Sequence, residues 1–399
     1  MNHPMRTVDD HLSDILRTVR TLAPLEVDLD QALGTTLAEE VTSPVPLPSF
    51  DNSAMDGYAV RAEDLATVPA KLQVLGDIAA GAGRTLAVGP GTAVRIMTGA
   101  PVPPGADTVI PVEWTDGGTV EVRIDRQAPE GNAIRRAGED VSAGQAVLPV
   151  GTPIGPAQLG ILAGVGRRRV LVRPRPRVVV ISTGAELVEP GAPLEAGQLW
   201  ESNSYTLAAA VQQAGGEGYR AGIVADDPAR FLDQLDAQLL RADAVITSGG
   251  VSMGAYEPVK EALSPLGTVR FERVAMQPGM PQGFGVVGQD QIPIFALPGN
   301  PVSSFVSFML FVRPALLKMR GLAAGPPYSV RGVTTAPLRS PQGRRSYLRA
   351  VLGHDGAVTP VRGQGSHQLA ALASANALIA VPEDVTELPE GSNVEVIPL

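Results

Sequence analysis

The chain has 399 residues, with 32 Lys and Arg against 41 Asp and Glu, and a formal net charge of −9. At about 150 residues per domain this length predicts two or three domains, and the acidic balance argues against a protein that coats nucleic acid or binds anionic membranes. Hydrophobic residues make up 44% of the chain and aromatic residues only 4%, which predicts folded cores but no stacking platform for single-stranded nucleic acid.

The first half of the chain predicts two short helices followed by a β-rich region. Apolar residues recur at helical spacing over residues 7–22, with Thr7 as a possible N-cap, and a second helix is expected near 28–38. The proline-dense stretch 43–50 ends this pattern. Short alternating runs split by Gly and Pro then predict strands, as at 93–99, 107–113 and 120–125.

The second half predicts an α/β domain and a terminal β-domain. Three apolar runs, 178–182, 244–247 and 294–297, each lead into a turn and then helical sequence, which predicts a parallel sheet covered by helices. Residues beyond 326 return to short β runs, so a small β-barrel-like domain is expected there. We therefore expect a multidomain α/β protein with these regions: 1–44 plus 145–176 as a helical and connector subdomain, 45–144 as a β-rich lobe, 177–325 as the central α/β domain and 326–399 as the C-terminal β-domain.

Residues 167–177 contain six arginines, the most basic run in the chain. A nucleic-acid patch is one interpretation. A solvated strand and linker is favoured instead, because no aromatic residues interleave with the arginines and the overall charge is negative.

The residue types exclude several kinds of metal and thiol chemistry. The chain has no cysteine and only four histidines, which rules out disulfides, zinc fingers, iron–sulfur clusters and thiol nucleophiles. A bound metal would be held by carboxylates, carbonyls or phosphate, which favours a hard cation such as Mg²⁺. The N-terminus lacks an apolar signal-peptide core, and the most apolar stretch, 302–312, is interrupted by serines. We expect a cytoplasmic protein with neither a membrane nor a nucleic-acid partner.

Three loops follow the predicted parallel strands, at the edge of the sheet where α/β domains bind ligands. They are STGAEL (182–187), ITSGGVSMG (246–254) and LPGNPVSS (297–304). The glycines of the second loop allow backbone N–H groups to approach a phosphate, and Asn300 and Pro301 are suited to begin a helix. The loops favour a nucleotide-like anionic ligand. No P-loop or GxGxxG pattern is present, so neither an ordinary NTPase nor a dinucleotide-dependent enzyme is supported.

Carboxylates near these loops and in the β-rich region suggest metal-bridged phosphate chemistry. Asp51, Asp56, Glu139, Asp140, Asp226, Asp227 and Glu257 are the candidates. Structural roles compete at several of them. Asp227 precedes Pro228 and suits a turn or helix start, Asp56 precedes a glycine, and Glu139 and Asp140 follow two arginines.

Seven segments together resemble the molybdopterin molybdenumtransferase family, the bacterial molybdenum insertases similar to the E domain of gephyrin. They are FDNSAMDGYAV (50–60), AVRIMTGAPVPPGADTVIPVE (93–113), RRAGED (135–140), STGAEL (182–187), SNSYTL (202–207), DAVITSGGVSMG (243–254) and LPGNPVSSFVSF (297–308). The matches run in order along essentially the whole chain.

The resemblance implies an activity and a quaternary structure. Such enzymes insert molybdenum from molybdate into adenylylated molybdopterin and release AMP, with the help of Mg²⁺ or another divalent cation. The family forms an elongated homodimer of four subdomains, in which each active site is shared between the α/β domain of one subunit and the β-rich lobe of the other. A molybdopterin adenylyltransferase would be the upstream partner. The absence of cysteine agrees with this activity, because the sulfur ligands of molybdenum must then come from the dithiolene of the substrate.

The resemblance also assigns roles to individual residues. It implies catalytic roles for Asp56, Thr98, Asp140, Glu186 and Asp226, of which Glu186 and Asp226 would also handle the metal. It implies substrate binding by Ser182, Thr183, Gly184, Ser248, Gly249, Gly250, Ser252, Glu257, Arg273, Pro298, Gly299, Asn300, Pro301 and Ser366. Position 257 is more often Asp in the family. Position 273 is often Lys, and Gln277 and Met280 also replace common lysines, which removes two cations from the substrate site.

Two other functions compete with this assignment. A molybdopterin adenylyltransferase would need only the middle domain, so the regions 1–176 and 326–399 argue against it. A non-catalytic dimeric scaffold would have no need to keep Asp56, Asp140, Glu186 and Asp226 together.

Overall fold

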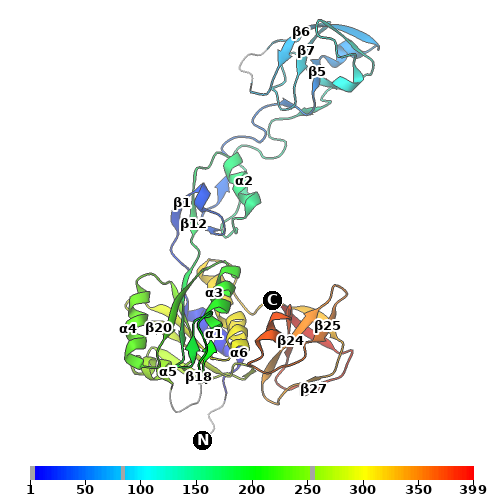
Figure 1. The fold of residues 1–399 in the computed structure, drawn as a ribbon. Coiled ribbons are helices and arrows are strands. Elements are labelled where there is room, and N and C mark those ends of the chain that lie inside the picture. The colour runs from blue at the N-terminus through cyan, green and yellow to red at the C-terminus, as the bar shows by residue number, and fades with distance from the viewer. Residues whose placement is uncertain (1–4, 82–85, 252–256) are drawn as a thin grey trace. The chain divides into compact units, whose positions relative to one another are not determined.

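The computed structural model describes residues 5–81, 86–251 and 257–399. The chain divides into two compact units. The larger unit comprises residues 1–25, 34–36 and 172–399, and the smaller unit comprises 26–33 and 37–171. Each is described by itself below, with the elements labelled as in Figure 1.

The smaller unit is built from short strands, as predicted for the β-rich region. Its main sheet has five strands in the order β8-β5-β7-β6-β9: Thr108–Pro111, Gly57–Val60, Thr92–Ile96, Ala70–Ile78 and Glu121–Ile124. Tyr58, Val60 and Ile110 are buried on one face of this sheet, and Ala59, Val94 and Val109 on the other. Two small pairs complete the lobe, β10 with β4 (Ile134–Arg135 with Asn52–Ser53) and β11 with β3 (Ala146–Leu148 with Val41–Thr42).

The connector predicted over 145–176 pairs with the segment after the first helix. Strand β12 (Arg169–Arg173) lies between β1 (Leu25–Asp28) and β2 (Thr36–Leu37), and helix α2 spans Pro156–Gly164. The helix predicted near 28–38 is wrong. The chain forms one 3₁₀ turn at Leu29–Gln31 and then strand β2, because Gly34 turns the backbone with φ of +79°.

Five of the six arginines of the basic run have ion-pair or hydrogen-bond partners within their own units. Arg167 pairs with Glu39, and Arg169 with Glu26 and Asp28. In the larger unit Arg177 pairs with Asp243, while Arg173 and Arg175 donate to backbone carbonyls of Leu22 and Gly216. These contacts agree with the strand-and-linker interpretation of the run.

The larger unit has a six-stranded mixed sheet as its centre. The order is β16-β13-β17-β21-β20-β18: Glu217–Val224, Arg177–Thr183, Ala244–Ser248, Ile292–Leu297, Pro281–Val287 and Val269–Arg273. The first four strands are parallel, as predicted from the three apolar runs, whereas β20 and β18 pair antiparallel. All four parallel strands place their carboxyl ends at one edge of the sheet.

Helices cover both faces of this sheet (Figure 1). Val178 and Val180 of β13 pack toward α1 (Val8–Thr18), α3 (Asn203–Gln213) and α6 (Pro301–Ser307). Val179 and Ile181 point to the opposite face, where α4 (Pro228–Leu239) and α5 (Pro258–Leu263) pack. This alternation explains why the strand is continuously apolar.

Helix α1 belongs to this core and not to the connector with which the sequence grouped residues 1–44. Thr7 caps it, as predicted, by accepting a hydrogen bond from Asp10 N. Its buried Leu12 and Ile15 lie in the same cluster as Phe308 and Phe311. The helix ends at Thr18, earlier than the apolar spacing predicts, because Val19 is extended.

The segment after β21 forms one long helical stretch. Helix α6 continues through a π-helical turn at Phe308–Val312 into α7 (Arg313–Met319). Ser303, Ser304 and Ser307 interrupt its apolar sequence but not the helix, in which all three are buried. Pro301–Met319 is long and apolar enough to cross a membrane by length and composition, but 78% of its most apolar window is buried inside the protein. This burial is typical of a core helix.

The C-terminal region is a small closed barrel. Its five strands pair in the order β24 (Arg345–Leu352), β25 (Ala357–Pro360), β22 (Val330–Thr334), β28 (Asn393–Pro398) and β26 (Ala377–Val381). Strand β26 also pairs with β24, which closes the barrel. Strand β19 (Met276–Gln277) extends the sheet from the α/β domain. The remaining strands and α-helix are β14 (Leu187–Val188), β15 (Leu199–Trp200), β23 (Leu338–Arg339), β27 (Glu387–Leu388) and α8 (Leu369–Ala373), and further 3₁₀ turns lie at Ala62–Leu65, Val112–Trp114 and Ser264–Leu266.

Candidate active site

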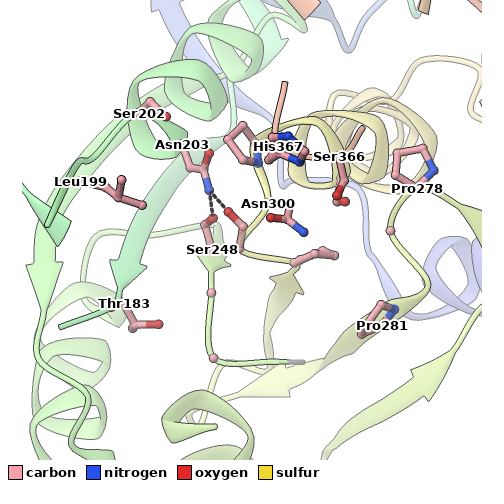
Figure 2. Close-up of a pocket in the computed structure, with 18 of the residues that line it drawn as sticks. Thr183, Leu199, Ser202, Asn203, Ser248, Pro278, Pro281, Asn300, Ser366 and His367 are labelled. Carbon is pink, nitrogen blue, oxygen red and sulfur yellow. Dashed lines mark hydrogen bonds between the residues drawn. The ribbon is translucent and has the colours of Figure 1, made fainter. Parts of the chain in front are cut away.

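A pocket of about 970 Å³ opens at the carboxyl edge of the parallel strands in the larger unit (Figure 2). Its wall includes Thr183 at the end of β13, Ser248 at the end of β17 and Pro298 directly after β21. Residues 276–281 and the barrel loop 364–367 complete the wall. Loops from two domains of one chain therefore meet around the same space.

Two glycines allow the loops at the floor of the pocket to pack closely. Gly249 has φ of +99° and Gly250 has φ of +66°, a left-handed conformation that suits glycine. A methyl group at Gly249 would lie 2.6 Å from the carbonyl oxygen of Thr183. The Thr183 side chain is 4% exposed and its hydroxyl oxygen has no hydrogen-bond partner among the described residues. This hydroxyl oxygen is fully covered by protein atoms and therefore lies behind the surface of the wall.

Asn203 joins three of the loops. Its Nδ2 donates to Ser248 Oγ and to the Gly299 carbonyl, both at 2.7 Å, as the dashed lines in Figure 2 show. Asn203 is the first residue of α3, so these bonds fix the amino end of that helix at the pocket.

Two further helices also begin at the pocket. Pro301 is the first residue of α6 and Asn300 is its N-cap, as predicted, although the Asn300 side chain makes no capping hydrogen bond. Glu257 precedes Pro258, the first residue of α5. Converging amino ends of helices favour an anionic ligand.

A buried carboxylate supports the pocket from behind. Glu201 is 1% exposed and accepts hydrogen bonds from Ser182 Oγ at 2.9 Å, Ser204 N at 2.8 Å and Ser204 Oγ at 2.6 Å. Arg220 lies 4.0 Å away and donates to the same Ser204 hydroxyl. Glu201 thus links the end of β13 to the first turn of α3.

The barrel loop is held by a buried arginine. Arg349 donates from Nη2 to the carbonyls of Gly363 at 2.6 Å and Gly365 at 3.1 Å, and its backbone exchanges hydrogen bonds with the Gln364 side chain. Burial lowers the pKa of the Arg349 guanidinium. Ser366, in the same loop, accepts a hydrogen bond from Val302 N through its carbonyl.

The ionisable side chains that line the pocket are mostly acidic. Among the described lining residues they are Glu186, Glu201, Asp226 and Glu257, with Arg344 and His367 as the basic groups. The Asp226 carboxylate accepts a hydrogen bond from Ala185 N at 2.8 Å, which ties the loop after β16 to the loop after β13. Asp227 instead caps α4 by accepting a hydrogen bond from Arg230 N, which supports the interpretation that it begins a helix.

Three family models match the chain in order. They are the MoeA N-terminal region (domain I and II) over residues 6–166, the probable molybdopterin binding domain over 179–318, and the MoeA C-terminal region (domain IV) over 331–399. The chain is 49% identical to molybdopterin molybdenumtransferase 2 of Mycobacterium tuberculosis, covering 98% of this chain and 99% of that protein. The chain belongs to the molybdopterin molybdenumtransferase family.

Other members agree in sequence and structure. Molybdopterin molybdenumtransferase 1 of Mycobacterium tuberculosis is 42% identical over 98% of both chains. A solved structure of the molybdopterin biosynthesis MoeA protein from Pyrococcus horikoshii superposes with a TM-score of 0.81 at 32% identity, covering 99% of each chain. These likenesses confirm both the family and the α/β multidomain fold with its small C-terminal barrel.

Most site residues inferred from the resemblance to the molybdenumtransferases line the pocket. Those that do are Thr183, Gly184, Glu186, Asp226, Ser248, Gly249, Gly250, Glu257, Pro298, Gly299, Asn300, Pro301 and Ser366. Ser182 is buried behind the wall, where it donates to Glu201. Arg273 is also set back, with Nη2 3.4 Å from the Met280 sulfur. Ser252 lies outside the described residues.

The remaining predicted residues of the molybdenumtransferase site belong to the smaller unit. Asp56 Oδ1 accepts hydrogen bonds from both the backbone N and the Oγ1 of Thr98, each at 2.7 Å. The backbone N–H of Thr98, together with its hydroxyl, lowers the pKa of the exposed Asp56 carboxyl. Asp140 is exposed as well. Its neighbour Glu139 accepts from Arg136 N, while the Arg136 guanidinium pairs with Asp51.

Several lining residues were not predicted from the sequence. Glu201 precedes the recognised SNSYTL motif and Asn203 lies within it, but nothing local indicates that Glu201 is buried or that Asn203 bridges three loops. Arg344, Gln364 and His367 come from the barrel and reach the pocket only through tertiary packing. Gln277 and Met280, noted only as departures from the family pattern, line the wall.

Proposed function

We propose that this chain inserts molybdenum from molybdate into adenylylated molybdopterin, giving Mo-molybdopterin and AMP. The two dithiolene sulfurs bind molybdenum as one molybdate oxygen leaves as water with the two thiol protons. A water molecule cleaves the phosphoanhydride that joins molybdopterin to AMP, and its oxygen stays on one of the two phosphates. The observation that carries the proposal is the pocket itself, which combines an anion cradle with four carboxylates at the carboxyl edge of the parallel strands in a chain of this family.

The cradle suits a substrate with two linked phosphates. The amino ends of α3 and α6 offer backbone N–H donors at the wall, beside the glycine loop 248–250. Such donors stabilise negative charge without reorganising as the reaction proceeds. We assign phosphate binding to these groups.

We propose that a divalent cation, such as Mg²⁺, assists the release of AMP. Among the described residues no group of three or more His, Asp or Glu side chains is placed to hold a metal ion by itself. Mg²⁺ is commonly held by one or two carboxylates together with substrate phosphates and water, so the hard oxygen donors of Glu186 and Asp226 fit this role. When bound, the cation would neutralise charge on the phosphoanhydride.

We further propose that the active enzyme is a homodimer in which the β-rich lobe of one subunit brings Asp56, Thr98 and Asp140 to the pocket of the other. The Asp56–Thr98 pair supports this arrangement, because an exposed carboxylate with a lowered pKa stays ionised and its orientation is set by two hydrogen bonds. A molybdopterin adenylyltransferase would supply the substrate. Because that step uses ATP, we place the reaction in the cytoplasm.

A single-turnover assay tests this function directly. Purified full-length protein is mixed with adenylylated molybdopterin and Mg²⁺, and AMP release is followed with and without molybdate. We expect AMP release that depends on molybdate, matched by formation of active cofactor and abolished by EDTA. Adenylylation of free molybdopterin from ATP would instead identify the preceding enzyme of the pathway, and binding without turnover would identify a scaffold.

A further inference from the structure

Trp200, next to Leu199 on β15, contributes an aromatic residue to a pocket wall otherwise lined by polar, aliphatic and proline residues. We propose that Trp200 stacks against a fused nitrogen heterocycle of the substrate, either its adenine or its pterin ring. This inference rests on the proposed function and assigns a ring-binding subsite within the same pocket.

The backbone of Trp200 is held rigidly. Strand β15 pairs in parallel with β14, so that Trp200 lies opposite Val188. Leu199 N donates to the Glu186 carbonyl and Glu201 N donates to the Val188 carbonyl, both at 2.8 Å. The neighbouring Glu201 side chain is itself buried and fully engaged in hydrogen bonds. The wall is therefore in place before a ligand binds.

The indole is fixed at its edge while much of its surface stays open. Its Nε1 donates to the Ala192 carbonyl at 2.8 Å, which satisfies its one polar group. Trp200 nevertheless remains 53% exposed and Leu199 60% exposed. Exposed apolar side chains in a pocket gain free energy when a ligand covers them, and an aromatic ring favours a planar partner.

Trp200 is distinctive in its surroundings. The chain has two tryptophans, and Trp200 is the only Phe, Tyr or Trp among the described residues that line the pocket. The nearby Tyr205 ring is already covered by the Arg220 guanidinium, whose carbon lies 3.5 Å from the ring centroid. Trp200 is thus the aromatic surface left for a ligand at this wall.

The opposite character of the two parts of the pocket matches a nucleotide-like molecule. Glycines and helix amino ends would face the phosphates, whereas the Trp200 indole offers a flat apolar surface. Stacking tolerates either heterocycle because both present a π face. The loss of such a contact is expected to weaken binding roughly tenfold.

Two substitutions separate stacking from packing. Trp200→Phe keeps an aromatic face, and Trp200→Leu keeps apolar bulk without one, while both lose the hydrogen bond to Ala192. The half-saturating concentration of adenylylated molybdopterin in the single-turnover assay is measured for each. We expect it to rise roughly tenfold in Trp200→Leu and by much less in Trp200→Phe, with little change in the maximal rate.

Calorimetric titrations of the full-length variants with AMP and with 6-hydroxymethylpterin assign the ring. The compound whose affinity falls in Trp200→Leu contains the ring that stacks. A Trp114→Phe background leaves Trp200 as the only tryptophan. In that background AMP should quench the tryptophan fluorescence of Trp200 if adenine is the ring that stacks on it. The inference would be overturned, even for an active enzyme, if wild type and both variants had the same half-saturating concentration of adenylylated molybdopterin and the same affinities for AMP and 6-hydroxymethylpterin. An inactive wild type would refute the proposed function, while the titrations would still decide the role of Trp200.

Discussion

The carbonyl of Ser366 in the C-terminal barrel accepts a hydrogen bond from Val302 N, in the first turn of α6, at 3.1 Å. The barrel therefore occupies one of the free N–H groups at the helix end that faces the pocket. Arg349 holds the same loop from inside the barrel. This contact makes the barrel a part of the pocket wall and explains why a site built on an α/β sheet includes residues more than sixty positions further along the chain.

Replacing Asp56 by Asn should remove insertion activity without unfolding the protein. The amide oxygen can still accept hydrogen bonds from Thr98, but the negative charge is lost, and we expect molybdate-dependent AMP release to fall by at least about 100-fold. Asp116→Asn is the matched control, because Asp116 is an exposed carboxylate of the same lobe that also accepts backbone hydrogen bonds. A wild-type rate of AMP release in purified Asp56→Asn would contradict a role for Asp56 in the reaction. Glu186→Gln tests a carboxylate of the larger unit in the same way.

Replacing Glu201 by Gln should loosen the link between β13 and α3. A Gln amide can meet the same groups, but three hydrogen bonds to a buried charge become weaker neutral ones, which costs about 1–3 kcal/mol in total. We expect a lower unfolding midpoint in urea and a raised half-saturating substrate concentration at a temperature where the variant is folded. Glu189→Gln, which removes an exposed carboxylate paired with Arg220, should change stability by less than about 1 kcal/mol. Equal effects of the two variants on substrate binding would argue against a positioning role for Glu201.

Replacing Gly249 by Ala should distort the floor of the pocket. Its positive φ costs a non-glycine residue roughly 1–2 kcal/mol, and the added methyl group would meet the Thr183 carbonyl. Gly267→Ala carries similar backbone strain, with φ of +70°, but its methyl group meets nothing within 4 Å. Both variants should lose stability, measured by thermal unfolding, whereas only Gly249→Ala should weaken AMP binding. A normal AMP affinity in Gly249→Ala would show that the close packing of these loops is not needed.

Replacing Gln277 by Lys should strengthen binding of the anionic substrate. Gln277 is exposed at the pocket wall, where the described ionisable groups are four carboxylates, one arginine and one histidine. An added cation near a phosphate is worth about 1 kcal/mol even in a water-like dielectric, so we expect the half-saturating concentration to fall about fivefold at low salt. Gln342→Lys, which adds the same charge outside the lining residues, is the control. The gain should shrink as ionic strength rises.

The pH dependence of stability should reveal the cluster around Glu272. A hydrogen bond from His11 and contacts with Arg6 lower the pKa of Glu272 from 4.5 to about 2. Because the folded-state pKa is lowered, the stabilisation is complete above about pH 4.5 and is lost as pH falls toward 2. Glu272→Gln should therefore cost up to about 3 kcal/mol at neutral pH, with a deficit that decreases between these pH values. The free energy of unfolding in urea, measured at pH 7 and pH 3 for wild type and variant, checks this prediction. Glu121→Gln, which removes the carboxylate of an exposed ion pair with Lys71, is the control.

Much of this fold and part of its site follow from the sequence alone. Continuous apolar runs predicted β13, β17 and β21, because strands that are covered on both faces need no polar positions. Glycines after these strands indicated the loops at the ligand-binding edge of the sheet. Asn300 and Pro301 indicated the start of α6, since capping depends on neighbouring residues only. The recognised motifs identified the family.

Only the tertiary structure decided which distant segments meet. Nothing in residues 7–18 distinguishes packing against α7 from packing against the connector, because an apolar helix face can be buried by any apolar partner. The burial of Glu201, the bridging role of Asn203 and the arrival of the 363–367 loop at the pocket depend on contacts between residues far apart in the chain. Local spacing determines the elements and their loops, whereas the pairing of their surfaces is a property of the whole fold.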